Sequence, residues 1–241
     1  MPQNPSLADL LQAGAHFGHR TSRWHPKMAP FIFGERSDIH IIDLEKTIQA
    51  LQNACAFVKG VAARGGTILF VGTKRQAQEI VKQAAEACGM PYVNERWLGG
   101  TLTNFSQIKL TIKDMLHMKD LREKGGLSQY TKKERLLIDR KIEEQEQKIG
   151  GIQKMNRVPE AIFVLDVRHD KTAIEEAKSV GVKVVAVCDS NVNPEPVDDI
   201  IPGNDDAVKS IALFAGAISS AIKEGVDEGL AAKATLQHQS L

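Results

Sequence analysis

Short apolar runs rich in β-branched residues alternate with helical patterns along most of the chain. The clearest runs lie at residues 67–71, 161–166 and 183–187, and weaker ones lie at 91–93 and 199–201. Helical patterns cover residues 44–64, 74–88, 171–180 and 207–223. Strands that alternate with helices form βαβ units, whose parallel sheet is covered by helices on both faces. The sequence therefore predicts an α/β fold built on a parallel sheet.

Two segments depart from this alternation. Residues 31–33 and 39–44 flank the turn-like run GERS at 34–37, which predicts a small hairpin. Residues 105–149 are strongly charged, and their apolar residues recur at spacings of three and four, as in a helix packed against one partner helix. Gly125 and Gly126 interrupt the pattern, and a capping box at 131–134 restarts it. We expect a protruding helical hairpin, or coiled coil, inserted into the α/β fold.

These patterns define the expected domain organisation. One discontinuous α/β domain covers residues 1–104 and 150–225, and the inserted hairpin covers residues 105–149. Residues 226–241 are small and polar with few apolar anchors. We expect them to form a polar tail that frays.

Several function classes are disfavoured by composition. The chain has only three cysteines, widely spaced and without a CxxC pair, so neither a disulfide framework nor a cysteine-rich zinc site is expected. The start of the sequence lacks the pattern of a secretory signal, and no apolar run approaches the ~20 residues that span a bilayer. We therefore expect a cytosolic protein.

The formal net charge of +1 conceals a polarised chain. Residues 1–150 hold 22 Lys and Arg against 16 Asp and Glu, whereas residues 151–241 hold 9 against 14. A basic part of a protein can lie on nucleic-acid phosphates while an acidic part faces another partner. The asymmetry could also arise by chance, because charge counting alone does not separate the two interpretations.

Ligands of open α/β sheets bind outside the carboxyl ends of the strands. Lys74 and Arg75 follow the first predicted strand there, at the start of a helix, where a phosphate can bind. That phosphate could belong to RNA or to a nucleotide, although no GxxxxGK[ST] or GxGxxG motif occurs. The alternative is a solvated helix start.

The later strand ends are acidic. Asp189, Asp205 and Asp206 could meet there, with His19 or His16 arriving from the amino-terminal segment. Such donors suit a structural zinc or magnesium ion, although no cofactor is required. The alternative is that Asp205 and Asp206 cap the helix that follows them.

The segment HFGHRTSRWHPK at residues 16–27 mixes cations with aromatic side chains. Arginine and lysine contact phosphates, and Trp24 can stack on an unpaired base. Arg96, followed by Trp97 and two glycines, has the same character. Burial of the first segment as a lid, and of Trp97 at the root of the hairpin, are the alternatives.

Six motifs, taken in order, resemble the bacterial small-subunit ribosomal protein S2 family. They are HFGH at 16–19, WHPKMAPFIFG at 24–34, IIDLEKT at 41–47, LFVGTKR at 69–75, RWLGGTLTN at 96–104 and IPGNDDA at 201–207. The resemblance covers roughly residues 6–225 in register. It implies a five-stranded parallel sheet of flavodoxin-like order with a protruding helical hairpin.

The resemblance also implies a function. It indicates a structural constituent of the small ribosomal subunit that binds 16S ribosomal RNA at the back of the particle, between head and body. Neighbouring ribosomal proteins would include ribosomal protein S1, which the family helps to dock. No membrane and no DNA partner is expected, and the acidic carboxy-terminal half would suit a protein partner.

We expect this function to need no catalysis. The expected RNA contacts are Arg20, Arg23, Trp24, Lys27, Lys74, Arg75, Arg96, Lys109, Lys113, Lys132, Lys133 and Arg135. The last five lie in the hairpin, which could equally face protein or simply be solvated. The rival hypothesis is a nucleotide- or metal-dependent enzyme that uses the strand ends, although no recognisable set of acid, base and nucleophile supports it.

Overall fold

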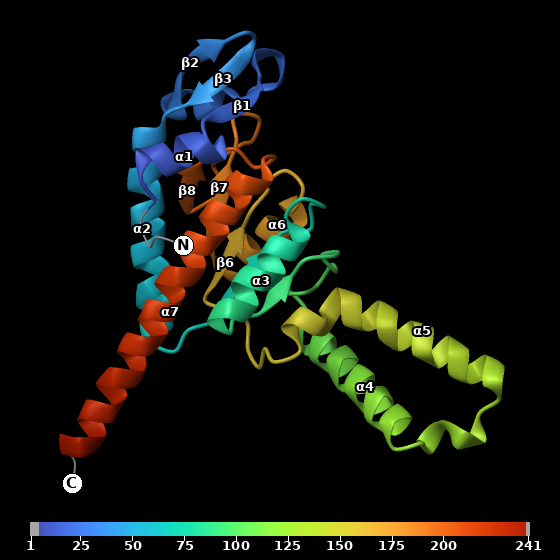
Figure 1. Ribbon diagram of the computed structural model, residues 1–241. Coiled ribbons are helices and arrows are strands. Elements are labelled where there is room, and N and C mark those ends of the chain that lie inside the picture. The colour runs from blue at the N-terminus through green and yellow to red at the C-terminus, as the bar shows by residue number, and fades with distance from the viewer. Residues whose placement is uncertain (1–4, 240–241) are drawn as a thin grey trace.

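In the computed structural model, which describes residues 5–239, five parallel strands form the central sheet (Figure 1). These strands are β4 (Ile68–Val71), β5 (Tyr92–Val93), β6 (Ala161–Val164), β7 (Lys183–Cys188) and β8 (Asp199–Pro202). The spatial order is β5-β4-β6-β7-β8. This is the flavodoxin-like order: from β4 the chain adds β5 on one side and then β6 on the other, so the topological switch point lies between β4 and β6. All five predicted strands and the predicted fold class are confirmed.

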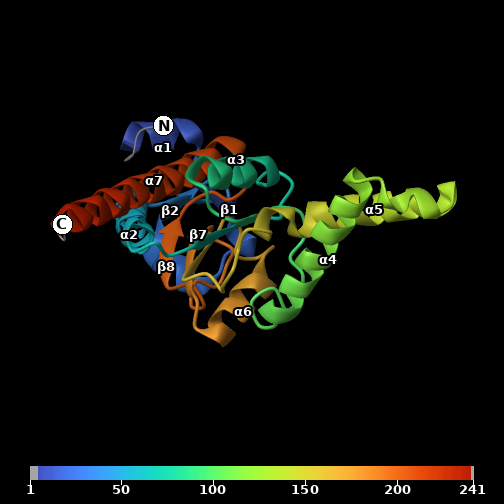
Figure 2. The ribbon, with the colours of Figure 1, turned by 90° about the horizontal axis from the view of Figure 1, so that it is seen from below.

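Helices cover both faces of this sheet. One face is covered by α2 (Leu44–Ala63), α3 (Gln78–Cys88) and α7 (Val208–Gln239), and the other by α6 (Lys171–Val180), as Figure 2 shows from below. Strand β4 shows why the predicted strands are uninterrupted apolar runs: both of its faces are buried. Its residues Ile68 and Phe70 pack in one core and Leu69 and Val71 in the other, because successive side chains point to opposite faces.

A second, three-stranded antiparallel sheet caps the carboxyl ends of the large one (Figure 1). It contains β1 (Phe17–Arg20), β2 (Ile32–Arg36) and β3 (Ile39–Ile42) in the order β1-β3-β2. The hairpin was predicted, but its turn lies at Ser37 and Asp38, both with positive φ, and not at residues 34–37. Strand β1 was not among the predicted strands, because its four residues have no alternating apolar pattern.

Short elements lead into and out of the small sheet. The helix α1 (Leu7–Ala13) precedes β1, and the 3₁₀ turns η1 (Thr21–Arg23) and η2 (Pro26–Phe31) join β1 to β2. Met28 in η2 is fully buried. Met28 thus anchors the connection between β1 and β2 to the core on one face of the large sheet.

Helix α7 is longer than the sequence indicated. It continues past residue 225, where we expected a polar tail to begin. Gly225 and Gly229 allow this, because a Cβ atom at either position would collide with a backbone oxygen of α2. The ammonium group of Lys59 on α2 also pairs with Glu224 at 3.2 Å and with Glu228 at 2.8 Å. Close backbone approach and these ion pairs, together with the partly buried Val226, dock this part of the helix.

Two helices occupy the segment between β5 and β6. They are α4 (Phe105–Glu123) and α5 (Lys132–Ile149), joined by η3 (Gly126–Gln129), and they project from the core (Figures 1 and 2). The α5 capping box predicted at Thr131 is present. Ion pairs link Lys119 to Glu146 at 2.6 Å and Arg122 to Asp139 at 3.7 Å. The turn η4 (Gly150–Ile152) returns the chain to the sheet. The proposed division into separate domains stays a prediction.

Candidate nucleic-acid interface

Lys74 lies just beyond the end of β4, at the topological switch point between β4 and β6. Its ammonium nitrogen contacts carboxylate oxygens of Asp166 at 2.9 Å, Asp205 at 3.0 Å and Asp206 at 2.7 Å. The Lys74 side chain is only 15% exposed, and Asp166 and Asp205 are buried. These contacts do not favour the predicted role of Lys74 in binding an RNA phosphate, which stays a prediction. The charge of Lys74 is already neutralised by side chains of the protein.

Electrostatics agree with this geometry. Burial lowers the pKa of Lys74, but attraction to Asp205, Asp206 and Asp166 outweighs burial and raises its pKa above the usual value. Burial, together with repulsion from Asp166 and Asp189, raises the pKa of Asp205 to about 7. The cluster is a charged network in which each group depends on its neighbours.

His19 fastens the small sheet to this network. Its Nδ1 atom lies 3.1 Å from Asp189, and its Nε2 atom lies 3.3 Å from Asp206. The hydrogen bond to Asp189 raises the pKa of His19, burial opposes the change, and attraction to Asp205 and Asp206 adds to it. Of the expected metal ligands, His19 thus contacts Asp189 and Asp206 directly, and the metal site itself stays a prediction.

Their arrangement differs from the metal site that we expected. Within residues 5–239, no three His, Cys, Asp or Glu side chains are grouped so that they could hold a metal ion. The carboxylates instead face the ammonium group of Lys74 and the ring of His19. The structure gives these residues an ion-pairing role.

Asp170 closes the same crevice from the other side. Its carboxylate accepts a hydrogen bond from the Thr73 amide at 3.2 Å and one from the Thr73 hydroxyl at 2.7 Å. Burial raises the pKa of Asp170, although both bonds from Thr73 oppose the change. Sequence reasoning missed this pair, because Thr73 and Asp170 are 97 residues apart in the chain. In an enzyme of this fold, the turns after β4 and β6 would contact a ligand. Here the turn with Thr73 and the turn with Asp170 are hydrogen-bonded to each other.

The cations of the amino-terminal segment lie on the surface. Arg20 and Arg23 are exposed, and within the described part of the chain neither forms an ion pair. Lys27 pairs with Glu195 but stays half exposed. Trp24 is 40% exposed, and its ring lies 5.0 Å from that of His40. The end of β1 and the turn η1 therefore present two exposed arginines close in sequence to the Trp24 ring.

Arg75 and Arg96 extend the basic surface along the ends of β4 and β5. Both are exposed, and no carboxylate of residues 5–239 pairs with either of them. Lys74 and Arg75, adjacent in sequence, thus have different environments. Only Arg75 can reach a partner outside the protein.

The predicted contacts on α4 and α5 are also exposed, but some are already engaged. Lys109 donates to the carbonyl of Asn156 at 3.1 Å and lies over the Phe105 ring. Arg135 donates to the carbonyl of Tyr130 at 2.9 Å. Lys113, Lys132 and Lys133 are exposed and form no ion pair within the described residues. This arm therefore contributes fewer free cations than the sequence suggested.

Glu176 on α6 is a buried acid that sequence reasoning missed. One carboxylate oxygen accepts from the Trp97 indole at 3.1 Å and from the Gly100 amide at 2.8 Å. The other accepts from the amides of Leu102 at 2.9 Å and Thr103 at 3.2 Å, and from the Thr103 hydroxyl at 3.2 Å. Burial raises the pKa of Glu176, but these donors outweigh burial and hold its pKa below the usual value.

This pKa predicts an acid-dependent loss of stability. A carboxylate whose pKa is lowered on folding stabilises the native state above its unfolded pKa, and loses that effect as the pH falls through its folded value. We therefore expect Glu176→Gln to lower the urea midpoint most near neutral pH, and progressively less below the ordinary value of 4.5. Urea unfolding at several pH values checks this, and a difference that grows toward acid pH would contradict it.

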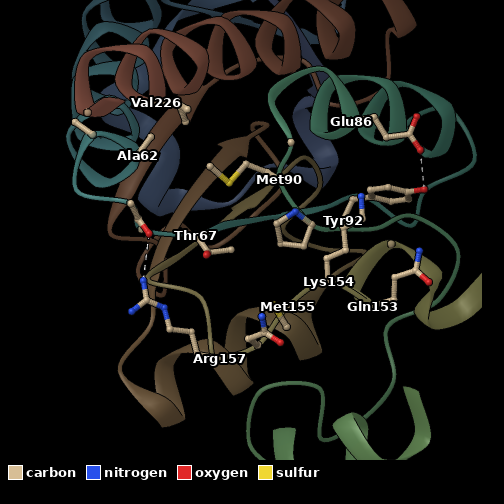
Figure 3. A pocket seen from close by; sticks show the side chains of 18 of the residues that line it. Ala62, Thr67, Glu86, Met90, Tyr92, Gln153, Lys154, Met155, Arg157 and Val226 are labelled. Carbon is tan, nitrogen blue, oxygen red and sulfur yellow. Dashed lines mark hydrogen bonds between the residues drawn. The ribbon is translucent and has the colours of Figure 1, made fainter. Parts of the chain in front are cut away.

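A pocket of about 800 Å³ opens at the opposite end of the sheet, near the amino ends of β4 and β5. Figure 3 shows Met90, Tyr92, Met155 and Arg157 around it, with Tyr92 bonded to Glu86. None of the residues predicted to bind RNA or metal lines this pocket. The candidate interface therefore lies on the carboxyl side of the sheet, on a surface and not in a cavity.

Comparison with known families supports the resemblance seen in the sequence. The family model described as ribosomal protein S2 matches residues 10–225. The match includes every predicted contact residue and extends through α4 and α5. No helix among the described residues is long and apolar enough to cross a membrane.

Proposed function

The chain belongs to the ribosomal protein S2 family, a family of structural proteins of the small ribosomal subunit, and from this premise we propose that it binds 16S ribosomal RNA. The proposed site is at the back of the particle, between head and body, in the cytoplasm. Exposed arginines without a carboxylate partner in residues 5–239 carry the proposal: Arg20, Arg23, Arg75 and Arg96. Such side chains are free to neutralise phosphates, which dominate the affinity of proteins for nucleic acids.

We further propose that the protein has no catalytic activity. At the topological switch point between β4 and β6, Lys74 contacts three carboxylates and Thr73 contacts Asp170. These contacts close the crevice in which a ligand would bind. A substrate would have to break these contacts before it could bind. Turnover of a nucleotide by the purified protein would contradict this part of the proposal.

Docking of ribosomal protein S1 is the second proposed role. The acidic excess of residues 151–241 supports a protein partner for that half, because like charge disfavours RNA there. Purified small subunits that lack this chain should retain less S1 after sedimentation, and adding the chain back should restore it. Equal retention of S1 with and without the chain would contradict the role.

The RNA proposal predicts the behaviour of a charge-reversal variant. Arg20→Glu combined with Arg23→Glu should weaken association with small subunits by about tenfold or more at 0.15 M salt, because two phosphate contacts are lost. Sedimentation of tagged protein on sucrose gradients at several salt concentrations measures this.

The matched control is Arg64→Glu combined with Lys223→Glu, which makes the same change in net charge. Arg64 lies just beyond the end of α2, and Lys223 lies on α7; both are exposed and have no ion pair among the described residues. The control should sediment with subunits like the unaltered protein. If both variants lose association equally, net charge and not this surface controls binding.

A further inference from the structure

The loop of residues 94–104 is held in one shape from inside. Glu176 accepts five hydrogen bonds from four of its residues, so the loop folds around an anion of the protein's own. Gly100 has a φ of +88°, which a glycine adopts without strain. A solvated surface loop does not require a buried carboxylate bonded to several of its backbone amides. The fixed conformation of residues 94–104 therefore indicates a role beyond that of a connecting loop.

The outer side of this loop suits a phosphate backbone. Arg96 is exposed and has no ion pair among the described residues. A Cβ atom at Gly99 would meet no atom within 4 Å, so the backbone there is open to a close partner. Asn104 is exposed as well and offers a polar side chain beside it. Arginine, open backbone and short polar side chains are the groups that contact phosphate and sugar.

Because Glu176 occupies the inward amides, the loop cannot wrap around a phosphate. The Gly100, Leu102 and Thr103 amides point to the carboxylate and are used up. An incoming phosphate is therefore met by the Arg96 side chain on the outside. Holding the loop backbone that carries Arg96 in place before binding reduces the loss of freedom on association.

We propose that Glu176 is a positioning residue for RNA recognition, which holds the loop of residues 94–104 so that Arg96 meets an RNA phosphate. This inference rests on the proposed RNA-binding function and deepens it. Glu176 itself does not touch RNA, because its side chain is buried behind the loop.

The first test compares Glu176→Gln with Glu175→Gln. The amide group of glutamine donates where one carboxylate oxygen accepts, so it opposes at least two of the loop donors. Glu175 is the adjacent glutamate on the same helix, but its side chain is 60% exposed and pairs only with Lys171, at 3.3 Å. Binding of the full-length protein to 16S ribosomal RNA is measured at several salt concentrations.

We expect Glu176→Gln to weaken RNA binding by about fivefold or more at 0.15 M salt, and Glu175→Gln to leave it unchanged. Log affinity falls as log salt rises, and this dependence should become shallower in Glu176→Gln. The magnitude of its slope should be smaller by roughly 0.7–0.9, which corresponds to one lost phosphate contact. A purely structural role for Glu176 would lower stability without changing this slope. An unchanged slope with unchanged affinity overturns the proposal.

A double-mutant cycle links Glu176 to Arg96. Arg96→Ala alone should weaken binding by about fivefold, but it should add almost nothing when Glu176→Gln is already present. If the two losses multiply, the residues act independently and Glu176 does not position Arg96. If the unaltered protein does not bind the RNA, the proposed function itself fails, an outcome distinct from a cycle that shows no coupling.

Trp97→Phe provides a milder variant in case Glu176→Gln does not fold. It removes only the indole donor to Glu176 and keeps an aromatic ring in its place. We expect the same decrease in salt slope with a smaller loss of affinity. A folded Trp97→Phe protein with unaltered binding, together with a Glu176→Gln protein that does not fold, would reduce Glu176 to a structural residue and overturn the proposal.

Discussion

Lys74→Met should lower the free energy of unfolding by roughly 3–5 kcal/mol, because it leaves buried carboxylates without their cation. Asp166 and Asp205 are 6% and 2% exposed, and both contact the Lys74 ammonium group. Methionine retains most of the apolar stem, so the change removes charge with little change of volume. Urea unfolding followed by circular dichroism measures the difference.

Two further variants show whether the lost charge causes the effect. Lys171→Met removes an exposed ion pair with Glu175 and should change the free energy of unfolding by at most about 1 kcal/mol. Lys74→Met combined with Asp205→Asn should recover part of the loss, since one unpaired charge is then removed as well. A Lys74→Met protein as stable as the unaltered chain would show that the carboxylates find other partners.

The sheet could be predicted from sequence, because each strand carries a local signal. Runs buried on both faces, such as Leu69 and Phe70 in β4, are apolar without interruption. Helix ends were equally visible where a glycine in the left-handed region ends the helix, as Gly89 and Gly181 do. These features depend on a few neighbouring residues and not on the rest of the fold.

The errors share another cause. Strand β1 exists because Phe17 and Arg20 pair with β3, and α7 continues because Gly225 and Gly229 lie against α2. In each case the decisive partner is distant in sequence. Lys74 shows the same limit: its place after a strand was predicted, but its three carboxylate partners were not, since they come from two different turns.

The candidate interface was predicted in part for the same reason. Exposed arginines such as Arg23 and Arg75 can be recognised by composition, because an arginine in a turn is usually solvated. Glu176 carries no such signal: in sequence it is one of two adjacent glutamates on a helix. Only the approach of residues 97–103 to that helix separates Glu176 from Glu175.

The fold and the function are connected through the topological switch point between β4 and β6. In α/β enzymes this crevice binds the ligand. Here His19 and Lys74 link three loops with the small sheet across the crevice. The same contacts hold the basic amino-terminal segment in a fixed place on the core. A fold shared with enzymes thus serves as a rigid support for surface cations, and the residues of the site, rather than the fold, determine the function.

Phe163→Ala should cost about 3–5 kcal/mol of unfolding free energy, as large an effect as that of Lys74→Met but from a different cause. Phe163 is fully buried on β6, and its ring packs edge-on against Phe70 of the adjacent strand at 5.5 Å and 78°. Alanine leaves a cavity between β4, β6 and the helices that cover them, because neighbouring side chains collapse only in part.

Phe163→Leu is the control, because it fills most of this space and should cost far less than the alanine variant. The folded fraction of Phe163→Ala should bind 16S ribosomal RNA like the unaltered protein, since Phe163 faces the core and no exposed arginine contacts it. Unfolding and RNA binding measured on the same samples check both statements. If binding falls in proportion to stability while the protein stays folded, the basic surface depends on core packing and is not a set of independently positioned cations.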